Sequence, residues 1–243
     1  MIDRYKARLV AHGFRQRPGI DYIETTAPVA RSSSVKVMLA IAHFLRLEVH
    51  QFDVTAAFIN APIDVDIYME QPKGFSSEEH PNHVCKLNKG LYGLKQAGNL
   101  WNTMLVNILT NDLGLKQLYK DRCVFVQTNP EDYLLLLVYV DDILIMSKKP
   151  EFKRRIIERM ENEFGFVYRG TINQFLGMEV NFDSIKGYSM SQQLLIKSIL
   201  EKTNLTVGKI NSTPLVPREA IAPTGEDDSP IDQTRFREEL KFN

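Results

Sequence analysis

The chain has 243 residues, of which 44% are apolar and 25% charged, and its formal net charge is zero. These values are ordinary for a globular protein with a sizeable core. The longest apolar run, Tyr133 to Val140, falls far short of the about 20 residues of a membrane-spanning helix, so no membrane partner is expected. Two cysteines, Cys85 and Cys123, exclude a disulfide framework, and the charged start excludes a visible signal peptide, which predicts an intracellular protein, cytoplasmic or nuclear and not secreted.

In the first half of the chain, residues 5–14 alternate loosely and predict a strand, followed by a loop to residue 31. Serines 32–34 offer a helix N-cap, and apolar residues then recur at helical spacing to about Leu47. Residues 49–54, 67–70 and 84–87 are strand candidates, and residues 95–113 predict a helix ended by Gly114.

In the second half, residues 123–127 and 133–146 predict strands, and residues 151–164 predict a helix ended by Gly165. Residues 175–181 and 188–191 predict a hairpin, and residues 193–203 a helix. From Ser212 onward, repeated prolines indicate a mostly extended tail. Because helices and strands do not alternate regularly, we expect an α+β fold with helices on one face of a largely antiparallel sheet.

The charge is uneven along the chain. Residues 1–31 hold six Lys or Arg against three acids, and residues 148–159 hold six against two. Basic patches of this kind can bind phosphate groups even when the total charge is neutral. The alternative is that they are solvated faces, and a neutral total is unlike that of a dedicated nucleic-acid binder.

Two adjacent carboxylates, Asp141 and Asp142, interrupt an apolar run with eight apolar residues before them and four after. Burying two carboxylates side by side is costly, and a divalent cation would compensate because it prefers carboxylate oxygens. The competing interpretation is a hairpin turn in which both side chains face water. Asp53, after another strand-like stretch, fits a site in which two strands deliver carboxylates to a pair of metal ions for phosphoryl transfer.

The chain contains Tyr139-Val-Asp-Asp142 and Phe52-Asp-Val-Thr-Ala-Ala-Phe58, which together with four further segments resemble motifs of the reverse transcriptases of copia-type retrotransposon Pol polyproteins. Tyr139-Val-Asp-Asp142 is similar to their catalytic Tyr-x-Asp-Asp, and Phe52-Asp-Val-Thr-Ala-Ala-Phe58 to their first catalytic motif. The resemblance extends from Tyr5 to about Pro217 and includes four further segments in the family's order: Tyr5 to Ala11, Gln71 to Phe75, Leu91 to Ala97 with Trp101, and Phe175 to Val180.

The resemblance implies a right-hand polymerase, with an antiparallel palm sheet, partial fingers and the start of a thumb. Residues 5–205 would form the fingers and palm, with the family's first finger strands lying upstream of Tyr5. Residues 206–243 would be an extended tail, the start of a truncated thumb or connection region. The family implies a primed RNA or DNA template, dNTP substrates, and a larger polyprotein whose integrase and ribonuclease H are absent from this sequence.

The resemblance also implies roles for individual residues. Asp53, Asp141 and Asp142 would be the catalytic carboxylates, holding two Mg²⁺ ions, or Mn²⁺ in their place, with the backbone carbonyl of Val54. Asp142 would be the most peripheral of the three. The dNTP would be bound by Lys6 or Arg8 at its triphosphate, by Phe58 under its sugar and by Gln96, and the primer end by Phe175, Leu176 and Gly177. Phe58 as ordinary core, and Lys6 and Arg8 as exposed strand charges, are the alternatives.

The sequence departs from the family at three places. Gly98 and Asn99 replace a usual Pro-Arg pair, Ala61 replaces a usual Gly, and the lysine-rich link before the primer-end motif is replaced by a segment that contains Arg169. An inactive remnant that retains at most nucleic-acid binding is therefore an alternative function, and a different two-metal palm enzyme is a third. His80, His83 and Cys85 lack an evident fourth zinc ligand and indicate a solvated loop.

Overall fold

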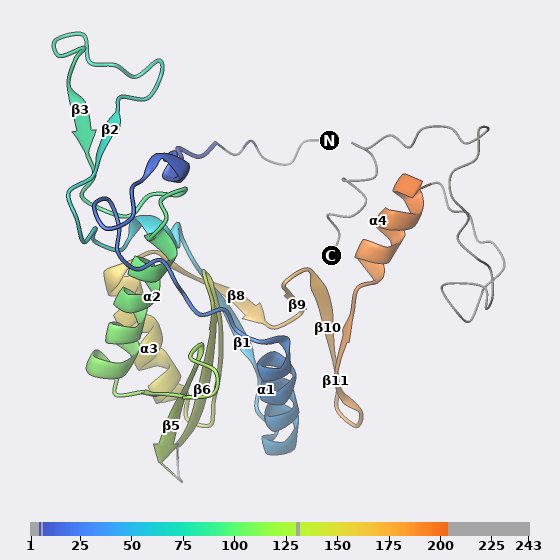
Figure 1. Cartoon of the computed structure of the whole chain (residues 1–243). Helices are drawn as coiled ribbons and strands as arrows, with labels where there is room; N and C mark the ends of the chain where they lie inside the picture. Colours follow the sequence, from blue (N-terminus) through green and yellow to red (C-terminus); the bar gives the residue numbers. More distant parts are fainter. Residues whose placement is uncertain (1–4, 6, 130–131, 204–243) are drawn as a thin grey trace, which may run out of the picture. The chain divides into compact units, whose positions relative to one another are not determined.

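The computed structural model describes residues 5, 7–129 and 132–203 (Figure 1). The chain divides into two compact units, one of Met1–Asn173 with Asn181–Ser189 and the other of Gln174–Val180 with Met190–Asn243. The tail predicted at 206–243 lies outside the described residues. No helix within the described part is long and apolar enough to cross a membrane.

The first unit is built on a six-stranded sheet in the order β4-β5-β6-β7-β1-β8, and every adjacent pair is antiparallel. This confirms the expected antiparallel sheet. A separate pair, β2 and β3, forms a hairpin at the far end of the unit (Figure 1). The strands are β1 His50–Val54, β2 Tyr68–Glu70, β3 Val84–Lys86, β4 Lys116–Gln117, β5 Val124–Asn129, β6 Asp132–Tyr139, β7 Asp142–Ser147 and β8 Phe166–Thr171.

Three α-helices accompany this sheet: α1 Ser32–Leu45, α2 Ala97–Asn107 and α3 Pro150–Glu163. The chain of α2 continues as a π-helix, Ile108–Asp112, and then turns at Gly114, which has a φ of 70°. Two short 3-10 helices occur at Gly13–Arg15 and Ala57–Ile59. The predicted helices therefore form close to their expected bounds.

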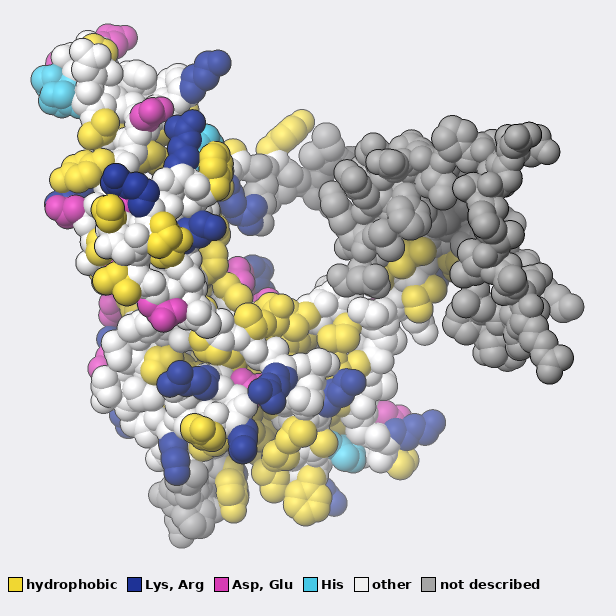
Figure 2. Space-filling view, viewed as in Figure 1, with side chains coloured by type: hydrophobic (Ala, Val, Ile, Leu, Met, Phe, Trp, Pro, Cys, Tyr) yellow, Lys and Arg dark blue, Asp and Glu magenta, His cyan; other side chains and the backbone are white. Residues whose placement is uncertain are grey.

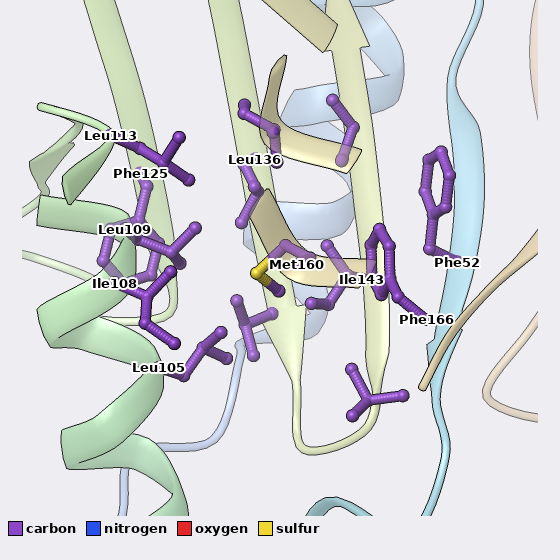
Figure 3. Packing of buried hydrophobic residues seen from close by; sticks show 14 of the residues in the cluster. Phe52, Leu105, Ile108, Leu109, Leu113, Phe125, Leu136, Ile143, Met160 and Phe166 are labelled. Atoms are coloured by element: carbon purple, nitrogen blue, oxygen red, sulfur yellow. The ribbon is translucent and has the colours of Figure 1, made fainter. Parts of the chain in front are cut away.

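One hydrophobic core lies between α2, α3 and one face of the sheet (Figure 3). Strand residues that alternate along β1 and β7, such as Phe52 and Ile143, point into it, because successive side chains in a strand face opposite sides. Met160 of α3 and Leu105 of α2 meet them from the helices. Trp101 is also in this cluster.

The other face of the sheet is covered in part. Leu137 and Leu144 are opposite each other on β6 and β7 and both are fully buried, although their side chains point away from α2 and α3. Figure 1 shows α1 on this side of the sheet. The expectation of helices on a single face is thus wrong, since a strand run that is apolar at nearly every position needs cover on both faces.

Two further differences concern strands. Residues 7–12 form no strand, because no strand among the described residues pairs with them. The backbone N–H of Ala11 instead donates a hydrogen bond of 2.7 Å to the carbonyl oxygen of Tyr92. Conversely, β8 was not predicted, although it pairs with β1 along its whole length. Its sequence, Phe-Val-Tyr-Arg-Gly-Thr, mixes strand-forming residues with a glycine that obscured the pattern.

The second unit contains β9 Gln174–Phe175, the start of β10 Met178–Asp183, the end of β11 Gly187–Ser191 and helix α4 Gln193–Thr203. The three strands form a sheet in the order β11-β10-β9. The hairpin and helix predicted for this region are therefore confirmed, with the hairpin strands shifted by a few residues.

Candidate active site

The strand register brings two of the three predicted carboxylates together. Asp53 of β1 is the direct cross-strand partner of Asp142 of β7. In an antiparallel pair, residues directly opposite each other project their side chains to the same face of the sheet. The two carboxylates thus share one face at the end of adjacent central strands, and both are half-buried.

The third carboxylate, Asp141, lies in the turn between β6 and β7. Tyr139 and Asp142 close the hairpin as partners, so Val140 and Asp141 are the two central turn residues. This differs from both sequence interpretations, because the turn contains one of the two aspartates and the strand contains the other. Val140 has a φ of 58°, which a β-branched residue rarely adopts. A positive φ at the first central position is what a II′ hairpin turn requires.

Neighbouring elements hold this strained turn from two sides. The indole Nε1 of Trp101, on α2, donates a hydrogen bond of 2.7 Å to the carbonyl oxygen of Val140. The backbone N–H of Val54 donates one of 2.8 Å to the carbonyl oxygen of Asp141. Strain of this kind persists only where the surroundings over-determine it, and it clusters at functional sites.

Two protein donors contact the paired carboxylates. Arg169 of β8 places its Nη2 2.6 Å from Oδ2 of Asp53. The Nε2 of Gln51, two residues before Asp53 on β1, donates to Oδ1 of Asp142 over 3.2 Å. Burial raises the pKa of Asp142, the Gln51 hydrogen bond opposes this, and the charges of Asp141 and Asp53 raise it further. The negative charges of Asp141 and Asp53 therefore act against the ionised form of Asp142.

The donor set fits a hard divalent cation such as Mg²⁺, which takes carboxylate and carbonyl oxygens. Yet across the described ranges no three acidic, histidine or cysteine side chains converge closely enough to hold an ion. Two of the carboxylates are instead held by protein donors: the guanidinium of Arg169 contacts Asp53, and the amide of Gln51 contacts Asp142. The residue types fit the metal, and the side chains are arranged around protein donors instead.

The residues predicted to bind dNTP are brought together in part. The Arg8 guanidinium lies over the ring of Tyr92, with its Cζ 5.7 Å from the centroid, and that ring packs against Phe58 at 5.2 Å. Phe58 is half-buried and also packs against the core clusters, so it has the contacts of a core residue. Lys6 lies outside the described residues.

Gln96 is fully buried, and its amide is bonded within the protein. Its Nε2 donates to the carbonyl of Asp21 at 2.9 Å, and its Oε1 accepts from Nε2 of Gln16 at 3.0 Å. Nearby, the side chain of Asn99 donates to the carbonyl of Thr26 at 2.7 Å. Both amides connect the loop of residues 16–27 to the start of α2, and the role of Gln96 at the nucleotide stays a prediction.

The predicted primer-end residues lie in the second unit, at the turn between β9 and β10. Phe175 pairs with Met178, so Leu176 and Gly177 are the two central turn residues. Their φ values of 51° and 75° are both positive, as a type I′ turn requires. Phe175 is 1% exposed, whereas Leu176 is exposed at the tip. The motif is thus a tight hairpin with one anchored aromatic residue.

The histidine pair outside this site forms a ring stack. The rings of His80 and His83 lie 4.4 Å apart with an interplanar angle of 6°, and Gln71 holds the carbonyls of both residues. Figure 2 shows basic side chains spread among apolar ones over one face of the molecule, without a single dominant patch.

Sequence reasoning missed the parts played by Gln51 and Trp101. The alternation of a strand was enough to place Gln51 on the face of Asp53, since the two are two residues apart. Trp101 lies in the core, and its bond to the β6–β7 turn depends on how α2 packs against the sheet, which no local pattern reveals.

Residues 1–217 match the family model described as reverse transcriptase (RNA-dependent DNA polymerase). The chain is 38% identical over 216 residues to the retrovirus-related Pol polyprotein from transposon RE1 of Arabidopsis thaliana, and 39% identical over 214 residues to that from transposon TNT 1-94 of Nicotiana tabacum. These matches cover 89% and 87% of this chain but 15% and 16% of the two polyproteins.

A shorter relative also matches. The putative transposon Ty5-1 protein of Saccharomyces cerevisiae is 30% identical over 163 residues, which is 67% of this chain and 53% of that protein.

Proposed function

Because the chain belongs to the reverse transcriptase (RNA-dependent DNA polymerase) family, we propose that it forms the templated polymerase core that extends a primer 3′-hydroxyl with dNTPs on RNA or DNA. The observation that supports this proposal is the pairing of Asp53 with Asp142, with Asp141 in the adjoining turn. The sheet would be the palm, the β2–β3 region part of the fingers, and the hairpin at Phe175 to Met178 the primer grip at the start of the thumb. Since the chain spans about 15% of the plant polyproteins it matches, we propose that it acts as one part of such a polyprotein.

We propose that Asp53 and Asp141, with the carbonyl of Val54, hold two Mg²⁺ ions, for which Mn²⁺ could substitute, and that Asp142 is peripheral. Two such ions supply activation of an attacking oxygen and stabilisation of a leaving one. The protein's own part is to fix the carboxylates on one face, through the β1–β7 register and the bonds to the turn. Arg8, beside Tyr92, would bind the triphosphate, with Lys6 as the alternative residue.

Phe58 would lie under the sugar of the nucleotide and exclude a ribose 2′-hydroxyl. Its contact with Tyr92, which in turn contacts Arg8, supports this placement because it puts the ring beside the proposed triphosphate side chain. Gln96 would reach the nucleotide only after releasing Gln16 and the carbonyl of Asp21. Shortening Phe58→Ala should raise rNTP incorporation relative to dNTP, whereas Phe75→Ala, on an exposed ring, should leave the ratio unchanged.

The test of polymerase activity is dNTP incorporation on poly(rA)/oligo(dT) with Mg²⁺ by the purified chain. Asp141→Asn should abolish incorporation, while Asp66→Asn, which removes an exposed carboxylate paired with Lys86, should leave it unchanged. Incorporation that survives Asp141→Asn would reject the assignment of the site.

The second candidate function is an inactive remnant that binds nucleic acid at most. The observation that favours it is the buried amide of Gln96, which is bonded to Gln16 and to the carbonyl of Asp21. A folded wild-type chain that binds the primed template but incorporates no dNTP would support this alternative over the first.

A further inference from the structure

A β-bulge lies beside the carboxylates. Along the β1–β8 pairing, Phe52 is opposite Tyr168 but Gln51 is opposite Gly170, so Arg169 is an extra residue on β8. Gly170 has a φ of 96°, a conformation that glycine adopts without strain. Bulges re-aim side chains, and they are over-represented next to active sites. Here the bulge lies on the strand that borders β1, next to the face that holds Asp53.

The contact made from this bulge is close and charged. The Nη2 of Arg169 lies 2.6 Å from Oδ2 of Asp53, and the two side chains are 54% and 29% exposed. On its other side, the Asp53 residue is opposite Asp142 across the strand pair, which brings a second negative charge close to it. An arginine remains protonated at any working pH, so it supplies a permanent positive charge at this point.

We propose that Arg169 competes with divalent cations for Asp53, holding this carboxylate in the metal-free protein and releasing it when metal binds. This inference rests on the proposed metal-dependent function, and it adds that Arg169 lowers the affinity of the site for divalent cations. Arg169 contacts Oδ2 of Asp53, and its guanidinium would repel a divalent cation held by the same carboxylate, so binding of the cation weakens or displaces the guanidinium contact. Gln51, bonded to Asp142, is neutral and would be displaced at smaller cost.

The size of the effect follows from the exposure of the pair. Exposed ion pairs contribute about 0.2–1 kcal/mol, and that range corresponds to a change in metal affinity of about 1.4- to 5-fold. Removing the guanidinium should therefore tighten Mn²⁺ binding by about 1.4- to 5-fold. Since salt screens exposed charge pairs, the difference should shrink as ionic strength rises from 0.01 to 1 M, where the screening length falls from about 30 to 3 Å.

The experiment measures free Mn²⁺ by electron paramagnetic resonance during titration of the full chain, with folding of each variant verified by far-UV circular dichroism. Arg169→Gln should bind Mn²⁺ more tightly than wild type, and Arg169→Lys, which keeps the charge, should stay close to wild type. Arg159→Gln is the matched control, because it breaks a 2.6 Å pair with Asp112 on other elements and should change nothing. In an Asp53→Asn background, Arg169→Gln should lose its effect.

Two outcomes separate failure of this inference from failure of the proposed function. If wild type binds Mn²⁺ and Asp141→Asn does not, but Arg169→Gln binds with equal or weaker affinity, the competition is rejected and the metal site stands. If neither wild type nor Arg169→Gln binds Mn²⁺ above the level of Asp141→Asn, both proposals are rejected.

Discussion

Replacing Trp101 with phenylalanine removes the hydrogen bond that fastens α2 to the carboxylate turn. The indole is 2% exposed and donates to the carbonyl of Val140 over 2.7 Å. A typical hydrogen bond contributes about 0.5–1.5 kcal/mol, and leaving a buried acceptor without its donor costs about 1–3 kcal/mol. Because Val140 is half-buried, water can partly replace the indole, so we expect Trp101→Phe to lower the free energy of unfolding by about 1–2 kcal/mol.

The assay is urea denaturation followed by far-UV circular dichroism. Fluorescence is unsuitable for this comparison because Trp101 is the single tryptophan of the chain. A change in midpoint with an unchanged slope would locate the effect in stability. In the proposed polymerase, incorporation should fall further than the unfolded fraction explains, because the turn that carries Asp141 loses one of its two anchors.

Phe164→Leu is the matched control, since it alters the ring that packs edge-on against Trp101 at 5.1 Å and leaves the indole bond in place. This variant should lose stability through packing while the folded fraction keeps its activity. Should Trp101→Phe unfold at the wild-type midpoint, or should Phe164→Leu lose activity to the same extent, the hydrogen bond would not be what positions the turn.

Three other predictions concern structure away from the carboxylates. Asp121 accepts hydrogen bonds from residues at the start of α1, and although burial raises its pKa, the hydrogen bonds outweigh burial and lower the pKa overall. Asp121→Asn should therefore lower the free energy of unfolding by about 1 kcal/mol at neutral pH. Denaturation measured at several pH values should show this loss diminishing as the pH falls below about 4. Burial, with Asp121 nearby, raises the pKa of Cys123 to about 12, so in the folded chain a thiol reagent should label Cys85 and spare Cys123 until urea is added. Gly93 has a φ of 91° and a backbone contact with Ala11 that leaves no room for a Cβ, so Gly93→Ala should lower the thermal midpoint, and a midpoint equal to wild type would contradict this packing.

The sequence predicted most of the second-half elements because their signals are local. The apolar run around Asp141 and Asp142 has strand character on both sides, and α3 has a clear helical period with a proline at its first turn. What it could not predict was the exact position of the turn. A shift of one residue places Asp142 in the strand opposite Asp53, and this register is fixed by burial across β1 and β7.

The predicted strand does not form at residues 7–12, because strand formation depends on pairing with a distant segment and not on a local signal. A strand needs a partner for its backbone groups, and alternation within one segment says nothing about whether a partner is present. The same limit hid β8, which exists because β1 offers an edge, and with it the bulge that aims Arg169 at Asp53. Pairwise contacts between elements, here α2 to the turn and β8 to β1, determine the details of the site.

The contacts of the basic residues indicate which of them can bind phosphate without first breaking an existing interaction. Arg159, in the patch predicted at residues 148–159, is paired with Asp112 and Glu163. Lys153 of the same patch contacts Nε2 of His50, and burial lowers the pKa of this lysine. A side chain engaged in this way has to break an existing contact before it can bind a phosphate, which weakens its attraction for nucleic acid.

The same argument applies to three arginines elsewhere in the described part of the chain. Arg17 is paired with Asp21, and Arg169 with Asp53. Arg8 is held by a ring rather than by an acid, since its guanidinium lies over Tyr92. A cation over an aromatic face keeps its full charge and its hydrogen-bond donors for a second ligand. The surroundings of Arg8 therefore suit its proposed role at the triphosphate, and Arg8→Gln should weaken dNTP binding more than Arg17→Gln.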